Sequence, residues 1–228
     1  MQRLATVCDW LGRIENGSLG AHAIVFSDEK NFNLRGEMGN VHSARVWVLK
    51  GRPKQGLLPE MIIREQKSFG PSVMASMAAG SKVVCDPVSI PYGTTINGPY
   101  YRDCILRSRL FPEVIAKCGS QWIWQQDNAP PHRLLGTTAF LDEKNPNWLK
   151  PWPWPARSKN LLDFYVWPAL AQRVYGRKPD TIDGLQQYIY KEAVAVDMSL
   201  VRRAVANFAE RIHMAKSEDG GHIKHKLM

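Results

Sequence analysis

At the centre of this sequence stands Gln121-Trp122-Ile123-Trp124-Gln125-Gln126-Asp127-Asn128-Ala129-Pro130-Pro131-His132. It begins as a short apolar run in which Trp and Ile alternate, which is the pattern of a buried strand, and the run stops at an acid. The two prolines that follow cannot donate to a β-ladder, so the strand cannot continue through them. A carboxylate at the end of a buried strand is costly unless a cation meets it, and Asp127 therefore marks a candidate site.

Two other stretches place a single acid beside an apolar element. The run Ala23-Ile24-Val25-Phe26-Ser27 predicts a strand that ends at Asp28. The run Leu161-Leu162-Asp163-Phe164-Tyr165-Val166-Trp167 predicts a helix with Asp163 in its first turn. Each acid alone is more often a turn-former or a helix cap than a metal ligand, and the spacing of the three does not decide between these roles.

Carboxylates from separate helices and strands are the ligands from which a two-metal site is built. Two divalent cations about 3.5–4 Å apart promote phosphoryl transfer when carboxylates bridge and flank them. Mg²⁺ takes oxygen ligands and keeps several waters, so two or three acids suffice to hold it. Asp28, Asp127 and Asp163 are the candidate ligands in this chain.

Length and composition bound the class of protein. The chain has 228 residues, of which 44% are hydrophobic, enough for one sizeable folded domain. Its net charge of +9 favours a polyanionic partner such as nucleic acid, although a generally basic protein would show the same balance. The four cysteines are scattered without paired spacing, which argues against a zinc ribbon or a disulfide framework and favours a reducing compartment. No apolar run is long enough to span a membrane, and no membrane partner is expected.

Strand patterns dominate the first half of the chain and helix patterns the second, which predicts an α/β fold with a mixed central sheet flanked by helices. We expect a helical lead-in at 1–20, one domain at 21–216 and a basic, flexible tail at 217–228. The segment 71–79 is compatible with either a strand or a helix. The remaining predicted strands are 21–27, 45–49, 82–90 and 121–126, and the predicted helices are 97–119 with a break at Pro112, 131–143, 162–174, 181–193 and 200–212.

Three motifs carry a family resemblance. They are Phe26-Ser27-Asp28-Glu29-Lys30, the stretch Gln125–His132 quoted above, and Trp154-Pro155 through Ser158 to Leu162-Asp163-Phe164-Tyr165-Val166-Trp167. In this order they resemble the catalytic domain of mariner-type transposases of the Tc1/mariner superfamily. The resemblance runs from about residue 1 to the Gly-Gly-His near residue 222.

The resemblance implies an RNase H-like fold and cut-and-paste DNA transposition with two Mg²⁺ or Mn²⁺ ions. By position, Asp28, Asp127 and Asp163 match the metal-binding D,D,D triad, and the Asp in third place is typical of the mariner side of the superfamily. The implied partners are double-stranded DNA, both the inverted-repeat ends and the target, and a second copy in a homodimer. A nuclear location follows from the same resemblance.

The chain also departs from the family pattern. Ser158-Lys159-Asn160-Leu161 stands where members carry Ser-Pro-Asp-Leu-Asn-Pro, and it is two residues shorter, which would shift Asp163 relative to Asp127. The paired helix-turn-helix domains of the family have no counterpart before residue 21, so we expect a catalytic domain without its N-terminal DNA-binding region. The alternative is an inactive or domesticated remnant that acts as a DNA- or protein-binding module. A general RNase H-like nuclease fits less well, because the flanking motifs are transposase-like.

Overall fold

The computed structural model describes residues 2–34, 71–145, 147–150 and 160–219. The predicted strand at 45–49 and residues 220–228 of the predicted tail lie outside this part of the chain. Within it, no helix combines the length and the apolar character that crossing a bilayer requires.

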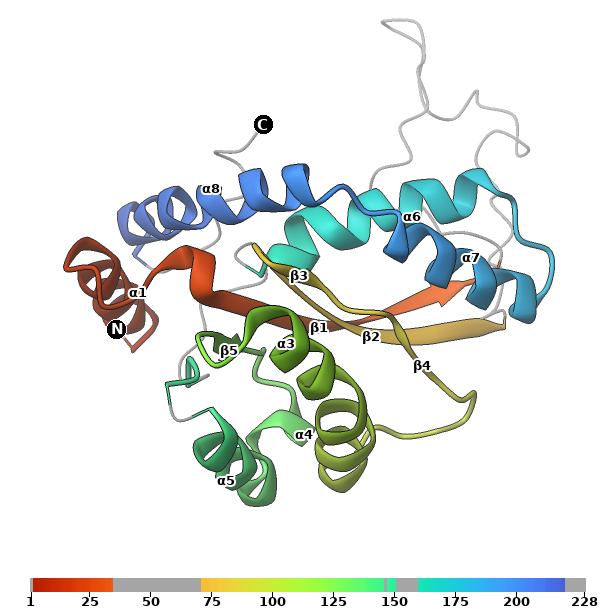
Figure 1. Ribbon diagram of the computed structural model, residues 1–228, viewed down its shortest axis with the longest axis horizontal. Helices are drawn as coiled ribbons and strands as arrows, with labels where there is room; N and C mark the ends of the chain where they lie inside the picture. The colour runs from red at the N-terminus through yellow and green to blue at the C-terminus, as the bar shows by residue number, and fades with distance from the viewer. Residues whose placement is uncertain (1, 35–70, 146, 151–159, 220–228) are drawn as a thin grey trace, which may run out of the picture.

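A mixed sheet forms the middle layer (Figure 1). Strand β1 (Ile24–Asn33) pairs antiparallel with β2 (Ser72–Gly80) on one side and parallel with β5 (Ile123–Gln125) on the other. The short strands β3 (Val83–Val84) and β4 (Val88–Ile90) both pair antiparallel with β2. The mixed sheet predicted from the sequence is confirmed, and segment 71–79, which the pattern left open, is a strand.

Strand β1 is longer than predicted. We expected it to end at Asp28, but it continues to Asn33, and that boundary was wrong. The reason is β2, which runs alongside it and pairs residue for residue from Gly80 opposite Val25 to Ser72 opposite Asn33. Backbone pairing of this kind holds polar residues in a strand that local pattern alone would end. Asp28 therefore lies inside a strand, opposite Met77.

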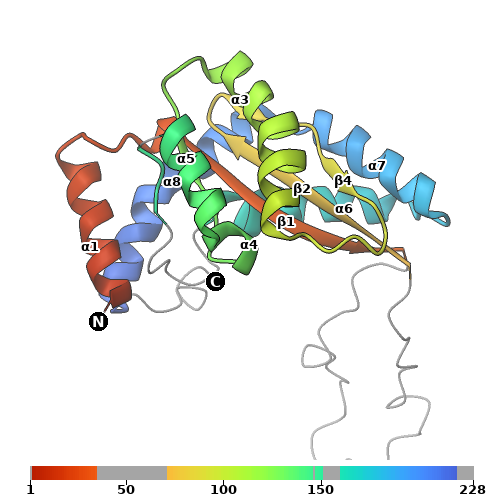
Figure 2. The same cartoon turned by 90° about the horizontal axis from the view of Figure 1, so that it is seen from below.

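One face of the sheet is covered by α6 (Trp167–Gly176), α7 (Ile182–Val194) and α8 (Met198–Ser217), as Figure 1 shows. Phe26 of β1 packs edge-on against Phe208, with ring centroids 5.3 Å apart. Helix α1 (Gln2–Glu15) joins the same core, because Trp10 is buried and its ring centroid lies 6.2 Å from that of Phe208. Figure 2 shows α1 beside α8 at one end of the sheet. The predicted N-terminal helix is confirmed.

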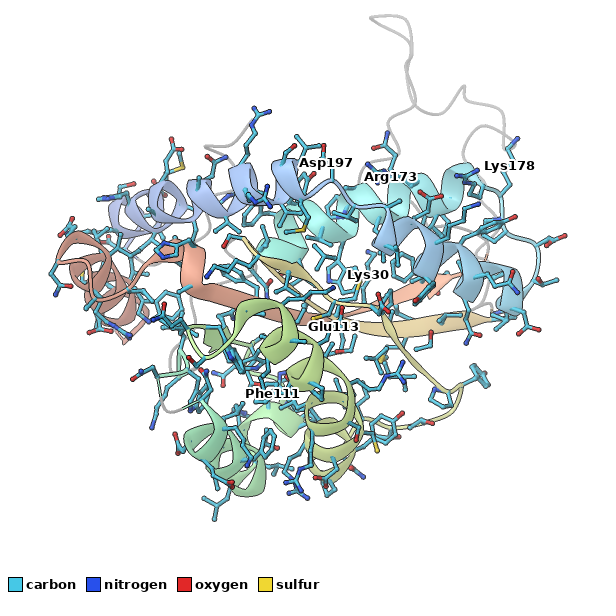
Figure 3. All side chains as sticks on the ribbon, in the orientation of Figure 1. Lys30, Phe111, Glu113, Arg173, Lys178 and Asp197 are labelled. Carbon is cyan, nitrogen blue, oxygen red and sulfur yellow. The ribbon has the colours of Figure 1, made fainter. Side chains whose placement is uncertain are left out.

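The opposite face carries η4 (Tyr100–Leu110), α3 (Phe111–Cys118), α4 (Pro130–Arg133) and α5 (Leu135–Lys144). Phe111, labelled in Figure 3, centres this second core and contacts the rings of Trp122, Trp124 and Phe140. The break predicted at Pro112 is absent, since Leu110 and Phe111 keep helical angles and the chain runs on from η4 into α3. The helix predicted at 131–143 is instead two helices, since Leu134 between them is extended (ψ 140°).

Candidate active site

Two of the three predicted acids share a pocket. Asp28 projects from the middle of β1, and Asp163 comes from η5 (Leu162–Val166), the first turns of the helix that continues as α6. Together with Glu29, Lys30, Trp167 and Pro168 they line a pocket of about 280 Å³. Figure 3 shows Lys30 at the level of the sheet, between the two helical layers. A strand and a helix 135 positions apart in sequence (163 − 28) thus bring two carboxylates to one cavity.

The surroundings of Asp28 disfavour the charged form of its carboxylate. Burial is the main cause that raises its pKa to about 8, and the negative charges of Asp163 and Glu29 raise it further. The indole Nε1 of Trp167 donates a hydrogen bond to Asp28 Oδ2 at 2.9 Å, which favours the charged form and opposes the shift. The geometry therefore fixes the orientation of the Asp28 carboxylate and leaves its charge largely uncompensated by the described residues.

Asp163 is placed by the start of its helix. The carbonyl oxygen of Asn160 accepts the first helical hydrogen bond, from the Phe164 N–H at 3.2 Å, and its side-chain Oδ1 accepts from the Leu162 N–H at 2.9 Å. Asn160 is therefore the N-cap, and Asp163 is the third residue of the helix. A negative charge in the first turn is also favoured by the helix dipole.

Asp127 follows the C-terminal end of β5, as the sequence predicts. Its Oδ1 accepts a hydrogen bond from the Ala129 N–H at 2.9 Å and lies 2.6 Å from His132 Nδ1. Its side chain does not line the pocket of Asp28 and Asp163, and of the groups that shift the pKa of Asp28 its charge has the smallest effect. Asp127 thus lies near the pair on the neighbouring strand without joining their pocket.

His132 connects Asp127 with Glu29. Its ring is buried, and Nε2 lies 3.4 Å from Glu29 Oε2, whose other oxygen accepts a hydrogen bond from Ser76 Oγ at 2.9 Å. Burial alone would lower the pKa of His132, but the hydrogen bond to Asp127 and the charge of Glu29 raise it above its usual value. Burial raises the pKa of Glu29, against the effect of His132. The geometry therefore places both His132 and Glu29 beside Asp127.

Among the described residues, no three His, Cys, Asp or Glu side chains lie close enough together to form a metal site as they stand. The role of the three aspartates as ligands therefore stays a prediction. The sequence pattern did not identify two neighbours of the acids: Trp167, which donates a hydrogen bond to Asp28, and Asn160, which caps the helix of Asp163. The only local signal was an Asn three residues before an acid at a helix start, which is typical of a cap.

The amino-acid sequence of this chain is similar to those of two known transposases. No family model matches the chain. The Tc1 transposase of Caenorhabditis elegans is 23% identical over 197 residues, 86% of this chain and 68% of that protein. The Tcb1 transposase of Caenorhabditis briggsae is 25% identical over 190 residues, 82% of this chain and 64% of that protein. The chain thus spans about two thirds of the length of these relatives.

The fold of this chain is similar to that of several solved structures of Mos1 transposase. The catalytic domain of Mos1 transposase, solved with raltegravir and Mn, superposes with a TM-score of 0.71 at 17% identity and covers 96% of this chain and 94% of that one. The Mos1 paired-end complex with the left transposon end gives a TM-score of 0.74 at 20% identity, covering 97% and 62%. By sequence the chain is therefore similar to the Tc1 and Tcb1 transposases, and its fold is that of the RNase H-like catalytic domain of Mos1 transposase.

Proposed function

We propose that this chain catalyses divalent-metal-dependent cleavage and transfer of DNA strands, as the catalytic domain of a cut-and-paste transposase. The observation that carries the proposal is the pocket that joins Asp28 and Asp163, with Asp127 just after the end of the adjacent parallel strand β5, in a fold shared with the Mos1 catalytic domain. The similar proteins named above are transposases, and the similar structures include a Mos1 paired-end complex with the left transposon end and a Mos1 strand transfer complex.

The residues of the pocket fit a hard divalent cation. Carboxylate oxygens are the ligands that Mg²⁺ and Mn²⁺ take, and the pocket has room for an ion with its waters. Burial is the main cause that raises the pKa of Asp28, the negative charges of Asp163 and Glu29 add to it, and a bound cation would favour the charged carboxylate against these effects. Two such ions, when bound, activate the attacking oxygen and stabilise the leaving oxygen of phosphoryl transfer.

In this proposal Asp28 and Asp163 are the ligands that face each other across the pocket, and Asp127 completes the set from the end of β5. Trp167 holds the Asp28 carboxylate in one orientation through its 2.9 Å hydrogen bond. His132 and the Ala129 N–H hold Asp127 at the strand end. The backbone of Asp127 follows the strand that pairs with β1, which carries Asp28.

The remnant alternative is not favoured. It rested in part on the shortened third motif, which was expected to shift Asp163 relative to Asp127. The pocket that Asp163 shares with Asp28 and the similarity to transposases support the enzyme instead. DNA is the proposed partner, in the form of inverted-repeat ends and target, and a homodimer is the proposed assembly because paired-end complexes are among the similar structures. A nuclear location remains part of the proposal.

A strand-cleavage assay tests the function. The chain is incubated with supercoiled plasmid and with short labelled inverted-repeat duplexes in Mn²⁺, Mg²⁺ or EDTA, and both nicks and joined products are measured. We expect metal-dependent nicking and joining of 3′ hydroxyl ends, and a loss of at least about a hundredfold in Asp28→Asn, Asp127→Asn and Asp163→Asn. Asp183→Asn, an exposed acid on α7, is the matched control and should keep full activity.

Two results would count against the proposal. Nicking that survives all three substitutions would mean that the activity comes from another site or a contaminant. Hydrolysis without any joined product, on every substrate, would indicate a nuclease and not a transposase.

A further inference from the structure

The side chain of Asn160 connects the two elements that carry the paired acids. Besides capping the helix of Asp163, it donates from Nδ2 to the carbonyl oxygen of Ser27 at 2.9 Å, across 133 positions of sequence. Ser27 immediately precedes Asp28 in β1. One buried amide, 2% exposed, therefore contacts the backbone next to one acid and the helix turn that contains the other.

The position of this bond in the sheet explains why it can form. Strand β5 pairs with β1 only from Ile24 to Phe26, so its ladder stops one residue before Ser27. At Ser27 the carbonyl oxygen bonds a side chain from a different element, and Asn160 takes the place that a longer β5 would occupy. The end of the ladder thus opens a docking point for the helix start, directly beside Asp28.

The bond also answers the question that the shortened third motif raised. The motif is two residues shorter than the family pattern, but from Asn160 onward the chain is a capped helix of fixed geometry. Because Asp163 lies three residues after the cap, its position relative to β1 depends on where Asn160 is held. It does not depend on the number of residues before Asn160.

We propose that Asn160 is a positioning residue for the metal site: it fixes Asp163 against Asp28 by joining the capped helix start to the backbone of β1. This inference rests on the proposed metal-dependent function. Asn160 touches neither substrate nor metal in this account. It acts through Asp163, and removing it lets the two carboxylates of the pocket drift apart.

A buried amide elsewhere in the chain supplies a matched control. Asn145 is 6% exposed, accepts from the Trp124 N–H at 3.0 Å and donates to the Trp122 carbonyl oxygen at 2.9 Å. It makes the same kinds of bonds as Asn160, at nearly the same lengths, but on the far side of β5 from the pocket. A substitution at Asn145 reports the general cost of losing such an amide.

The experiment measures Mn²⁺ affinity by electron paramagnetic resonance of the free ion, with circular dichroism and Tm recorded for every variant. We expect Asn160→Ala to weaken Mn²⁺ binding about 10- to 100-fold, the usual effect of removing a residue that orients a metal ligand. Asn160→Ser, which keeps an oxygen able to cap the helix but cannot reach Ser27, should fold and show a loss of the same order. Asn145→Ser should lower Tm while leaving Mn²⁺ affinity within about threefold of wild type.

A double-mutant cycle identifies the route of the effect. If Asn160 acts through Asp163, then adding Asn160→Ser to Asp163→Asn should cause little further loss of Mn²⁺ affinity. Full additivity in this cycle would overturn the inference, and so would Mn²⁺ affinity in folded Asn160→Ser equal to that of Asn145→Ser. A folded wild type that binds no Mn²⁺ would overturn both the inference and the proposed function. If the wild type binds Mn²⁺ and the Asn160 variants bind it equally well, only the inference is overturned.

Discussion

Asp28 is a residue whose charge the folded protein holds at a cost. It lies inside a strand, mostly buried, next to Asp163 and Glu29, and the neutral indole of Trp167 donates a hydrogen bond to it. Groups with strongly raised pKa values in a pocket are typical of functional sites, where stability is given up for chemistry. The fold tolerates the unfavourable free energy of this carboxylate because it is confined to one pocket, beside two large hydrophobic cores that stabilise the rest of the protein.

This cost predicts that a neutral substitution stabilises the metal-free protein. In the folded state the pKa of Asp28 is about 8, against the ordinary aspartate value of 3.8, so between these values the folded state binds more protons than the unfolded one. The free energy of unfolding therefore falls as pH rises through that window. Asn cannot ionise, and Asp28→Asn in EDTA should raise the free energy of unfolding at pH 8 by at least about 1 kcal/mol, with a smaller gain at pH 5.

Urea denaturation at both pH values measures this effect, with Asp183→Asn as an exposed control that should change little at either pH. Adding Mn²⁺ should stabilise the wild type and reverse the order of the two proteins, since ligand binding to the native state alone adds stability. A wild type that is as stable as Asp28→Asn at pH 8 in EDTA would show that the carboxylate is not strained.

Sequence reasoning found the acids but not the residues that hold them. Asp28, Asp127 and Asp163 stand out because each interrupts or follows an apolar run inside a recognisable motif. Trp167 and Asn160 do not stand out, because their bonds to β1 cross 139 and 133 positions of sequence and exist only once the helix docks on the sheet. A tryptophan in an apolar helix pattern indicates core packing, and nothing local shows that its N–H faces an acid.

At the scale of elements, η5 and α6 form one arm that presents two groups to the pocket. Asp163 comes from the first turn and Trp167 from the next, four residues on, so both lie on the same face of the helix. Phe32 of β1 packs edge-on against the Trp167 ring at 6.0 Å and holds the indole in place. The arm is therefore fixed to β1 by aromatic packing as well as by hydrogen bonds.

Replacing the indole with a ring that lacks its N–H tests this arm. Trp167→Phe keeps an aromatic side chain beside Phe32 but removes the hydrogen bond to Asp28, and Mn²⁺ affinity should fall roughly tenfold. Trp148→Phe is the matched control, because Trp148 is equally buried and its Nε1 donates at 2.9 Å to Asp142, outside the pocket. Equal Mn²⁺ affinities in the two variants would contradict the role assigned to Trp167.

Helix α1 makes a second prediction at this scale. We expected residues 1–20 to be a lead-in to the domain, yet Val7, Trp10 and Leu11 are buried in the core shared with α8. Trp10→Ala should therefore cost about 3–5 kcal/mol of unfolding free energy, as expected for a large buried aromatic. Cys8→Ala on the exposed side of the same helix should cost less than about 0.5 kcal/mol. Chemical denaturation measures both, and a small loss in Trp10→Ala would mean that α1 is dispensable.

The elements that sequence reasoning misjudged share a cause. Local pattern located the helix that ends at Ser217, and it located the helix capped by Thr181, whose Oγ1 accepts from the Gly184 N–H. It failed at the end of β1, where pairing with β2 extends the strand over polar residues. It also failed at Leu134, where the chain becomes extended between α4 and α5 without a glycine or proline at that position to announce it. Both are set by tertiary partners.

At the scale of the whole molecule, the net charge of +9 makes a prediction about binding. A protein that neutralises even two or three DNA phosphates releases the counterions held there, so its affinity falls steeply with salt. Fluorescence anisotropy with a labelled inverted-repeat duplex should show a loss of roughly tenfold or more between 50 and 200 mM salt. Affinity that does not change over this range would argue against backbone contacts as the main source of binding.

The central claim is that Asp28, Asp127 and Asp163 hold divalent cations together, and isothermal titration calorimetry of Mn²⁺ tests it most directly. We predict that the wild type binds Mn²⁺ and that Asp28→Asn, Asp127→Asn and Asp163→Asn each lose most of this binding while staying folded, with Asp183→Asn unchanged. Binding that persists in all three variants, or a folded wild type that binds none, would contradict the claim.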